Sequence, residues 1–377
     1  MAGSIIAREL NARRQVAFAI ATEAEDPAIR RLLRHSPMRG AVDVTLEREP
    51  EYFRGEGLAG AEDQTIVAFE GDGLVCMGRC SRRPCWVNGR EVPVGYLAEL
   101  RMGARARERF GILRDGYRFF HESQRGDAAA LYFTSIAHDN ERARRLLERG
   151  ARGLPAYTFL AELATVLVEI PRRPRKGKLH VQAATVEQRT ELLQLLNAHA
   201  RRHQLGAVWT TKTLIDAERA GLPLDRFLLA AEGGELLAGA GLWDQRAFRQ
   251  AVIRGYSPML LAARPFLNLA RRFLRVPRLP TRGSILAHAF LSPVAFAAGA
   301  EGLLPDLVEA FFPLAARLGL EFLTLALPVS DPRLPALRRR FSTRTWLSRL
   351  YRVDWHGEAR MALDESAGPF LPDVALL

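Results

Sequence analysis

Two stretches of the sequence hold residues whose types and spacing could do chemistry. The first, 100–113 (LRMGARARERFGIL), places four arginines (Arg101, Arg105, Arg107 and Arg109) and two glycines directly before a predicted helix. Backbone N–H groups at a helix N-terminus attract phosphate, and arginines add charge to such a site. We interpret the stretch as a pyrophosphate clamp, and a solvated basic loop is the alternative that the residues leave open.

The second stretch, 133–150 (FTSIAHDNERARRLLERG), turns from an apolar strand into a basic helix at the letters AHDN. Asp139 or Asn140 is placed to cap that helix, because short polar side chains accept hydrogen bonds from the first N–H groups of a helix. Two roles are open for this turn. The end of the strand faces a bound ligand, or Asn140 only caps the helix and no ligand is needed. His138 is interpreted as a polar turn residue.

Alternating apolar patterns predict the elements that position these residues. In the first half we expect strands at 15–22, 65–70, 74–80, 86–102, 129–136 and 164–170, and helices at 26–35, 108–124 and 140–149. Asn88-Gly89 predicts a tight hairpin turn, and Asp26 is expected to cap the first helix. Strands and helices repeat in a similar order at 185–355, which indicates an internal duplication. The fold class is therefore α/β with a mixed sheet and at least one parallel pair.

A linker divides the chain into two domains. The segment 171–178 (PRRPRKGK) has two prolines, a glycine, five basic residues and no apolar anchor. We expect an N-terminal domain at 1–170, a C-terminal domain at 179–356 and a polar tail at 357–377. A chain of 377 residues is long enough for two cores.

Composition excludes several classes of function. All but three of the 54 basic residues are arginine, and they are mixed with acids along the whole chain, so the net charge of +12 does not favour nucleic-acid binding. Cys76, Cys80 and Cys85 lack the fourth ligand of a zinc site and are expected to be reduced thiols; no metal is expected. The chain has no signal-peptide layout and no apolar run long enough to span a membrane, which predicts a cytoplasmic protein.

With these motifs in view, the sequence resembles the GCN5-related N-acetyltransferase (GNAT) superfamily. The matching phrases are AELRM…RERFGIL and FTSIAHDNERARRLLERG, and YLAELRM, GLPAY and LWDQRAFRQAVIRGY are similar to a bacterial branch with two such domains in tandem. The resemblance covers most of 12–356. It implies two tandem acyl-CoA N-acyltransferase domains, the second of them degenerate, and acetyl-CoA as co-substrate.

The resemblance also implies site residues. Arg107 takes the Arg/Gln place of the family's pyrophosphate loop, whose small-residue places fall on Phe110 and Ile112, with Gly111 between them. This is a departure, because Phe and Ile hold a backbone away from phosphate where glycine would not. Asn140 matches the family's asparagine. The full set expected to bind the cofactor is Leu100, Arg101, Met102, Arg107, Glu108, Arg109, Phe110, Gly111, Ile112 and Asn140.

Acetyl transfer needs a proton acceptor, a polarised carbonyl and a proton donor. Glu99 stands where such enzymes often carry a glutamate and is the expected catalytic base, with Glu91 as second choice and a structural ion pair as the alternative role. The amides of 100–102 would polarise the thioester. The family's tyrosine position falls on Leu147, which leaves Tyr157 or water as the proton donor.

Three functions remain open from the sequence. The first is an N-acetyltransferase that moves an acetyl group from acetyl-CoA to an amine by direct attack, with a small molecule or peptide as acceptor. The second is a non-catalytic acyl-CoA-binding or regulatory module. The third is a tRNA-dependent aminoacyl transferase. Trp243, Asp244 and Arg249 would line a substrate cleft or form a buried polar network, and a homodimer is left open.

Overall fold

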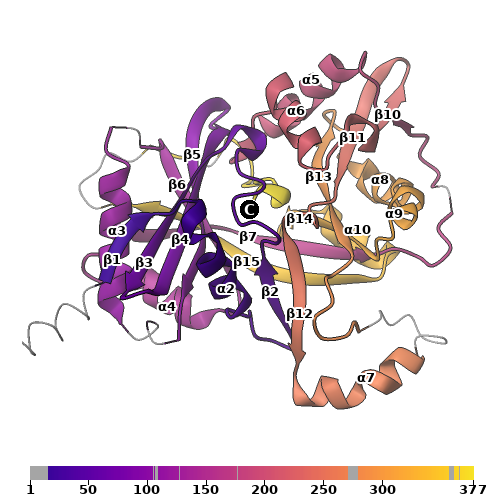
Figure 1. Cartoon of the computed structure of the whole chain (residues 1–377). Coiled ribbons are helices and arrows are strands. Elements are labelled where there is room, and N and C mark those ends of the chain that lie inside the picture. Colours follow the sequence, from indigo (N-terminus) through magenta and orange to yellow (C-terminus); the bar gives the residue numbers. More distant parts are fainter. Residues whose placement is uncertain are drawn as a thin grey trace, which may run out of the picture.

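A computed structural model describes residues 16–377 except 105, 107, 108, 127, 176, 271–278, 356–360 and 365, and leaves aside the side chains of 267–270. In this part of the chain one mixed sheet of thirteen strands runs through the molecule (Figure 1), in the order β1-β3-β4-β5-β6-β15-β7-β14-β13-β11-β10-β8, with β9 paired to β4. A two-stranded ribbon joins β2 to β12. The sequence-based prediction of a mixed α/β fold is confirmed.

The strands are β1 (Val16–Ile20), β2 (Val42–Glu47), β3 (Glu62–Glu70), β4 (Gly73–Val87), β5 (Arg90–Met102), β6 (Leu131–Ala137), β7 (Ala156–Glu169), β8 (Gln182–Ala183), β9 (Gly206–Ala207), β10 (Phe227–Glu232), β11 (Glu235–Trp243), β12 (Gln250–Tyr256), β13 (His288–Phe296), β14 (Phe322–Pro328) and β15 (Thr343–Asp354). The helices are α2 (Asp26–Arg34), α3 (Phe110–Ser123), α4 (Glu141–Glu148), α5 (Arg189–Ala200), α6 (Thr211–Arg219), α7 (Pro258–Ala270), α8 (Leu304–Ala310), α9 (Phe312–Arg317) and α10 (Arg333–Arg340). None of these described helices has the length and apolar character needed to cross a bilayer.

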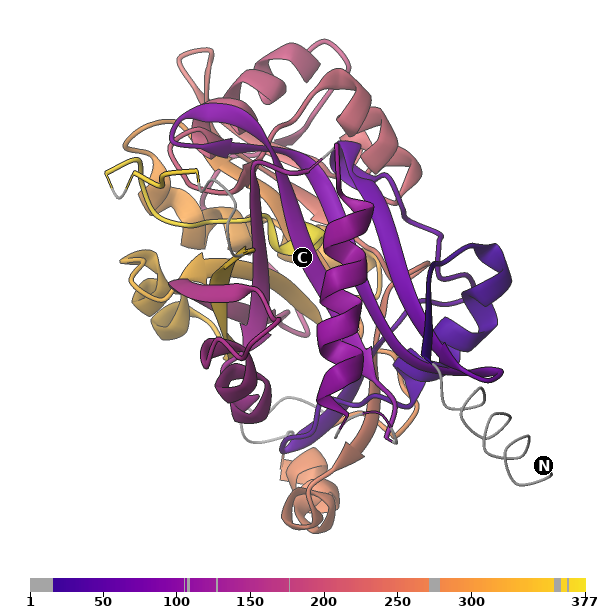
Figure 2. The same cartoon turned by 90° about the vertical axis from the view of Figure 1, so that its left-hand side faces the viewer.

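Each half of the chain contains one parallel strand pair joined by a helical crossover. In the first half β5 leads through α3 to β6, and in the second half β13 leads through α8 and α9 to β14. Figure 2 shows α3 lying along one face of the first half's strands. The repeated order that the sequence indicates is therefore present in the structure.

The last strand of the chain belongs to the sheet of the first half. β15 lies between β6 and β7, antiparallel to both. β7 pairs with β15 along nearly its whole length and with β14 over its second part. The boundary expected near residue 170 stays a prediction, and the sheet runs continuously through both halves of the chain.

Local turn and cap predictions give mixed results. Asn88 and Gly89 have φ angles of 52° and 69° and close the β4–β5 hairpin as predicted. The prediction that Asp26 caps α2 is wrong, because the N-cap is Glu25 and it makes no side-chain cap. Asp26 instead accepts hydrogen bonds from the Tyr52 backbone N–H and from Arg30. An aspartate in the first turn still suits the positive end of the helix dipole.

The segment expected to be a polar tail is packed into the protein. Asn88 donates to the Ala362 carbonyl over 2.8 Å, and Leu371 N–H donates to the Gln204 carbonyl over 2.9 Å. The chain then ends in a short 3-10 helix, Val374–Leu376, whose Ala375 is fully buried. Figure 1 shows this end lying between the two halves.

The strand arrangement predicts that both halves unfold together. Leu350 on β15 is fully buried in the core cluster of the first half. We expect Leu350→Ala to lower the free energy of unfolding by about 2–5 kcal/mol, the usual cost of such a cavity, and to shift one transition of the whole chain. Urea unfolding followed by far-UV circular dichroism and tryptophan fluorescence measures this. The exposed Arg344→Ala on the same strand is the control, and two separate transitions of which only one moves would contradict the expectation.

Candidate functional site

The parallel strands β5 and β6 pair only over their first part. Val94–Leu97 lie beside Leu131–Thr134, and the Thr134 hydroxyl donates to the Leu97 carbonyl over 2.7 Å. Beyond this point β6 pairs with β15 alone, and the end of β5 pairs with β4 alone. The two strands therefore diverge into a V at their carboxyl ends.

A bulge in β5 lies beside this V. The register with β4 shifts between Met77 and Arg79, and Glu99 opposite has a φ angle of 53°. A positive φ is uncommon for a residue with a side chain and marks a site held by its surroundings. The bulge leaves Leu100 38% exposed. It places the main chain of 100–102, the stretch expected to polarise a carbonyl, along the V.

The loop from β5 to α3 brings a helix start to the same end of the sheet. The Ala106 N–H donates to Gly103, and the Arg109 N–H donates to Ala106, both over 2.9 Å. Arg109 is the N-cap of α3 and its guanidinium pairs with Glu70 over 2.7 Å. The cofactor predictions for Arg107 and Glu108 lie outside the described residues. Arg101 donates to the neighbouring Leu100 carbonyl over 3.1 Å.

The structure gives a physical account of the departure at Phe110 and Ile112. Ile112 is 4% exposed and packs inward against Ala68 and Cys76, so it does not line the outer side of the loop. Phe110, at the first helical position, is 37% exposed. A Cβ built on Gly111 would meet nothing within 4 Å. The helix start therefore carries a glycine between Phe110 and Ile112, with open space where its side chain would stand.

Asn140 lies at the carboxyl end of β6, where α4 begins. Its side-chain oxygen accepts a hydrogen bond from the Ala143 N–H over 3.3 Å, so it caps α4 as predicted. His138, in the same turn, lies 3.2 Å from Glu162. Asn140 and the start of α3 flank the V from the two strands, and the binding of a cofactor by these residues stays a prediction.

Glu99 is held in a buried network on the face of the sheet opposite α3. Its carboxylate accepts a hydrogen bond from Arg48 over 2.7 Å and another from the Tyr52 hydroxyl over 2.9 Å. Arg79, beside it on β4, pairs with Asp63 over 2.8 Å. Glu99 thus forms the structural ion pair that the sequence left open as its alternative role. Glu91, the second choice, is exposed in the β4–β5 hairpin, away from this network.

This network determines how well Glu99 can take up a proton. Burial alone would raise the pKa of Glu99, but the guanidiniums of Arg48, Arg79 and Arg249 outweigh it and lower that pKa to about 2. A carboxylate with so low a pKa is a weak base. The assignment of Glu99 as proton acceptor stays a prediction. Its ion pair with Arg48 counts against direct uptake of a proton from the acceptor amine.

Two tyrosines lie near the V on opposite faces of the sheet. Tyr157, the sequence-based candidate for proton donor, is hydrogen-bonded to Tyr117 of α3, and burial raises its pKa. Tyr96 of β5 lies on the other face, against Phe133, with ring centroids 4.9 Å apart. Burial raises the pKa of Tyr96 to about 12, and Arg249 and Glu99 are among the charges that act on it. The sequence analysis missed Tyr96 although it opens the phrase YLAELRM, because its contact with Phe133 joins two strands far apart in the chain.

Arg249 joins the same network from the second half. It is half-buried and donates to the main-chain oxygens of Ala375 and Leu377. The Trp243 indole donates to the Ala220 carbonyl over 2.9 Å, and Asp244 pairs with Arg246. Of the two roles that the sequence left open for this stretch, the buried polar network fits these contacts.

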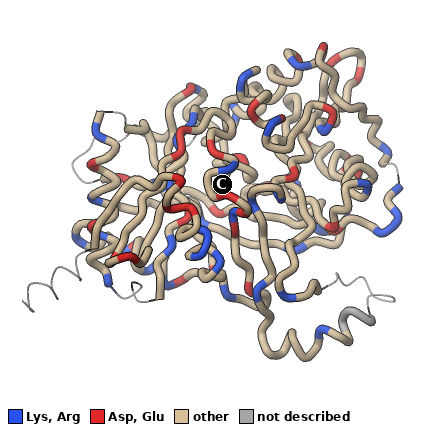
Figure 3. The backbone as a smooth tube through the Cα atoms, in the orientation of Figure 1, with Lys and Arg blue, Asp and Glu red and all other residues tan. Residues whose placement is uncertain are grey.

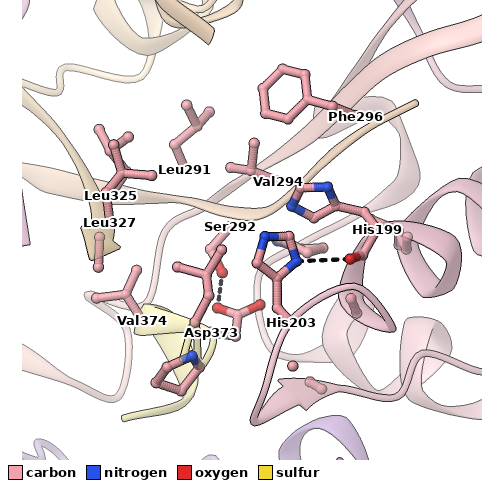
Figure 4. A pocket seen from close by; sticks show the side chains of 18 of the residues that line it. His199, His203, Leu291, Ser292, Val294, Phe296, Leu325, Leu327, Asp373 and Val374 are labelled. Atoms are coloured by element: carbon pink, nitrogen blue, oxygen red, sulfur yellow. Dashed lines mark hydrogen bonds between the residues drawn. The ribbon is translucent and has the colours of Figure 1, made fainter. Parts of the chain in front are cut away.

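The second half has its own pocket, where β13 and β14 diverge (Figure 4). It encloses about 700 Å³ of empty space, part of it open to solvent, between apolar side chains of both strands and two histidines of the α5 region. Ser292 donates to Asp373, and His203 lies 2.8 Å from the His199 carbonyl. Burial lowers the pKa of His199 to about 3, so its imidazole stays neutral at pH 7.

The three cysteines lie on β4 as free thiols, and burial raises the pKa of each to about 12. Within the described ranges, His, Cys, Asp and Glu side chains form no group of three able to hold a metal ion. In the view of Figure 3, basic and acidic residues are interspersed along the chain.

Comparison with solved structures identifies the fold of the chain. The chain superimposes on a GCN5-related N-acetyltransferase from Sphaerobacter thermophilus with a TM-score of 0.56 and 12% identity, over 93% of this chain and 98% of that one. The chain has the GNAT fold. Saccharomyces cerevisiae N-myristoyltransferase with bound myristoyl-CoA gives a TM-score of 0.57 and 12% identity, over 92% of this chain and 83% of that one. No family model and no curated protein matches the sequence.

A third solved structure with the GNAT fold comes from a multi-domain protein. The GCN5-related glucosamine N-acetyltransferase region of a fungal GH3 β-N-acetylglucosaminidase gives a TM-score of 0.56 and 13% identity, over 90% of this chain and 38% of that one. The resemblance to the GNAT superfamily is thus confirmed for the fold. Membership of the tandem bacterial branch stays a prediction.

The network around Glu99 predicts a pH dependence of stability. Because the pKa of Glu99 is lowered from 4.5 to about 2 in the folded protein, its contribution is complete above pH 4.5 and is lost as the pH falls towards 2. We expect Glu99→Gln to remove about 3 kcal/mol at pH 7 and to flatten the fall of stability between pH 4.5 and 2. Urea unfolding across this range measures it, with the exposed Glu62→Gln as control. An unchanged acid limb in Glu99→Gln would show that Glu99 is not ionised through these contacts.

Proposed function

We propose that the protein is an acyl-CoA-dependent N-acyltransferase that moves an acetyl group from acetyl-CoA to an amine. One observation carries the proposal: the V between β5 and β6 opens beside the start of α3, where Gly111 has open space around it. A pyrophosphate needs close approach to backbone N–H groups at a helix start, and Gly111 has no side chain of its own to block that approach. The GNAT fold shared with acyl-CoA enzymes supports the same placement.

In this proposal the first half holds the CoA thioester. The pyrophosphate would lie at 109–112, and the pantetheine arm would run along the main chain of 100–102 towards the V. Asn140, at the end of β6, would face the arm from the other strand. Arg101 would add charge at the rim, whereas Arg109 is already paired with Glu70.

The chemistry is direct attack by the acceptor amine on the thioester carbon. The amine nitrogen forms the new C–N bond, the C–S bond breaks, and the amine loses one proton while the CoA thiolate gains one. Tyr96 is the proposed proton donor, because it lies at the apex of the V and its raised pKa keeps its hydroxyl protonated at pH 7. Glu99 would balance the positive charge of Arg48 and Arg79.

Packing at the apex of the V supports a short acyl group. Val94, Phe133 and Leu163 fill this region together with Leu205 and Leu350 in one core cluster. The cavity that stays open there has a volume of only about 20 Å³ for water-sized molecules, which is room for about one water. A long acyl chain would have to displace these buried side chains at the cost of a close-packed core.

A non-catalytic acyl-CoA-binding module is the second candidate. The observation in its favour is the pairing of Glu99 with Arg48, which leaves the predicted base with little capacity to take up a proton. Both candidates predict acyl-CoA binding, and turnover separates them. The interspersed charges of Figure 3 do not favour a tRNA substrate.

The open space at Gly111 gives a direct test of cofactor binding. We expect Gly111→Ala to preserve or raise stability, because alanine is the better helix former by up to about 1 kcal/mol. Its methyl group would stand where the pyrophosphate must approach, so acetyl-CoA affinity should fall about tenfold or more. Calorimetric titration with acetyl-CoA measures the affinity, and thermal unfolding measures stability. Arg118→Ala, exposed on the same helix, is the control, and equal affinity in Gly111→Ala would rule out this placement of the phosphates.

Replacing Tyr96 tests the proton donor. We expect Tyr96→Phe to lower kcat about 100-fold, within the usual range for loss of a general acid, and to leave the Kd of acetyl-CoA unchanged. Because the pKa of Tyr96 is about 12, wild-type kcat should show no loss from this group between pH 6 and 10. CoA release with the best acceptor of an amine panel measures kcat. If Tyr157→Phe lowers kcat and Tyr96→Phe does not, the sequence-based candidate is the donor.

A further inference from the structure

The β2–β12 ribbon leads into a helix that projects from the body of the molecule. α7 follows β12 after a single residue, Ser257, whose N–H donates to the Ala41 carbonyl over 3.0 Å. Figures 1 and 2 both show α7 beyond the end of the ribbon, away from the large sheet. The helix is therefore anchored at its start and presents much of its surface to solvent.

The exposed residues of α7 form one apolar face. At 3.6 residues per turn, the exposed residues among 258–266 fall on a continuous arc of about 160°, and none of them is polar. Met259 is 83% exposed and Phe266 is 75% exposed, more than any other large apolar side chain of the described residues. Such a face marks an interaction site. The α7 face consists of Pro258, Met259, Leu261, Ala262, Pro265 and Phe266.

Arginines lie around the α7 face. Arg264 stands on the flank of the helix, and Arg39 and Arg282 lie at the end of the ribbon from which α7 starts. Among the described residues, no carboxylate forms an ion pair with any of the three. Asp43, close to Arg39 in the chain, accepts a backbone N–H over 3.1 Å instead. The sequence 245–300 contains no Asp or Glu, and α7 shows no acidic residue in Figure 3.

The chain returns from α7 along the flank of the helix and leaves the α7 face open. The Arg264 Nε donates to the Leu279 carbonyl over 3.2 Å, and the Tyr256 hydroxyl donates to the Pro280 carbonyl over 2.7 Å. Arg264 stands outside the arc of the α7 face. The described residues of the returning segment thus cover the side of Arg264, and the apolar side chains need another partner.

We propose that α7 docks the protein on the surface of an anionic phospholipid bilayer. The α7 face would lie at the boundary between headgroups and acyl chains, and Arg39, Arg264 and Arg282 would lie at the level of the headgroup phosphates. An apolar helix face with basic flanks binds such a surface, because burial of the apolar side chains and attraction of the arginines to anionic lipid act together. This docking goes beyond the proposed acyl transfer and does not depend on it.

The size and charge of the α7 face favour a lipid surface over a second copy of the chain. A helix of 13 residues is about 20 Å long and about 10 Å wide, so the face offers on the order of 200 Å². A stable protein interface buries about 800 Å² on each partner. In a twofold dimer the same arginines would also face one another. Nucleic acid would engage the arginines but leave the apolar side chains uncovered.

Vesicle sedimentation tests the proposal on the wild type. We expect binding to vesicles of phosphatidylcholine and phosphatidylglycerol in equal parts to exceed binding to phosphatidylcholine alone about tenfold or more, because each arginine near an anionic surface adds attraction. High salt should weaken the binding to the mixed vesicles. Absence of binding to the mixed vesicles, or equal binding to both compositions, would overturn the proposal.

Replacing the apolar side chains separates insertion from charge attraction. Met259→Ser combined with Phe266→Ser should lower the partition coefficient on mixed vesicles about tenfold or more, with an unchanged Tm because both side chains are exposed. Phe159→Ser, at a phenylalanine of β7 that is 51% exposed, is the matched control and should bind like the wild type. Unchanged binding by the double variant would reduce the contact to charge alone and contradict the docking.

Replacing the arginines tests the second half of the proposal. Arg39→Gln combined with Arg282→Gln should weaken binding to mixed vesicles about tenfold and leave the weaker binding to phosphatidylcholine unchanged. Arg344→Gln, at an exposed arginine of β15, is the control. Equal loss in Arg344→Gln would show that the net charge of the protein acts instead of this surface.

Two further measurements decide the matter even if the serine variant does not fold. Phe266→Trp should gain emission that shifts to the blue with mixed vesicles and is quenched by brominated lipid, relative to the wild type with its five tryptophans. No shift and no quenching would overturn the insertion of α7. Sedimentation velocity without lipid should show no self-association through this face. A wild-type dimer that Phe266→Ser dissociates would assign the α7 face to a second copy and overturn the lipid proposal.

Discussion

The insertion of β15 between β6 and β7 is the constraint on which the rest of the structure depends. A strand can diverge from its parallel neighbour only if its other edge keeps its hydrogen bonds, because unpaired backbone groups in the interior are costly. β6 meets this condition through β15, which pairs with Ser135–Ala137, the part that has left β5. The cleft of the first half therefore requires a strand from the end of the chain.

The continuous sheet also explains why charged groups gather where the two halves meet. Residues on the face of β4 and β5 opposite α3 are covered by the loop after β2 and by the chain end, so polar side chains there are buried together. Arg48 pairs with Glu99 and Arg79 pairs with Asp63, and buried charges of this kind are stable only when they are paired. Arg79 Nε and Arg83 Nη1 are buried donors of this network without a hydrogen-bond partner.

Local chemistry could be predicted from the sequence, and non-local pairing could not. The Asn88-Gly89 hairpin, the strand–helix–strand order and the cap at Asn140 follow from turn residues and periodicity. The β2–β12 ribbon and the exchange of β15 join segments far apart in the chain, and no periodicity encodes such partners. The bulge at Glu99 was missed for a related reason: a glutamate rarely adopts positive φ, and here its partners Arg48 and Tyr52 hold it there.

The two divergent strand pairs differ in a way that follows from their loops. β5 leads into an arginine-containing loop and a helix start at Gly111, whereas the stretch after β13 (AAGAEGLL) has no arginine. The second pocket accordingly offers apolar walls and two histidines instead of a phosphate site. Asp373 lines both this pocket and the small cavity beside Tyr96 at the apex of the V, and it is hydrogen-bonded to Ser292 of β13. The short segment that carries Asp373 thus forms part of the wall of both cavities.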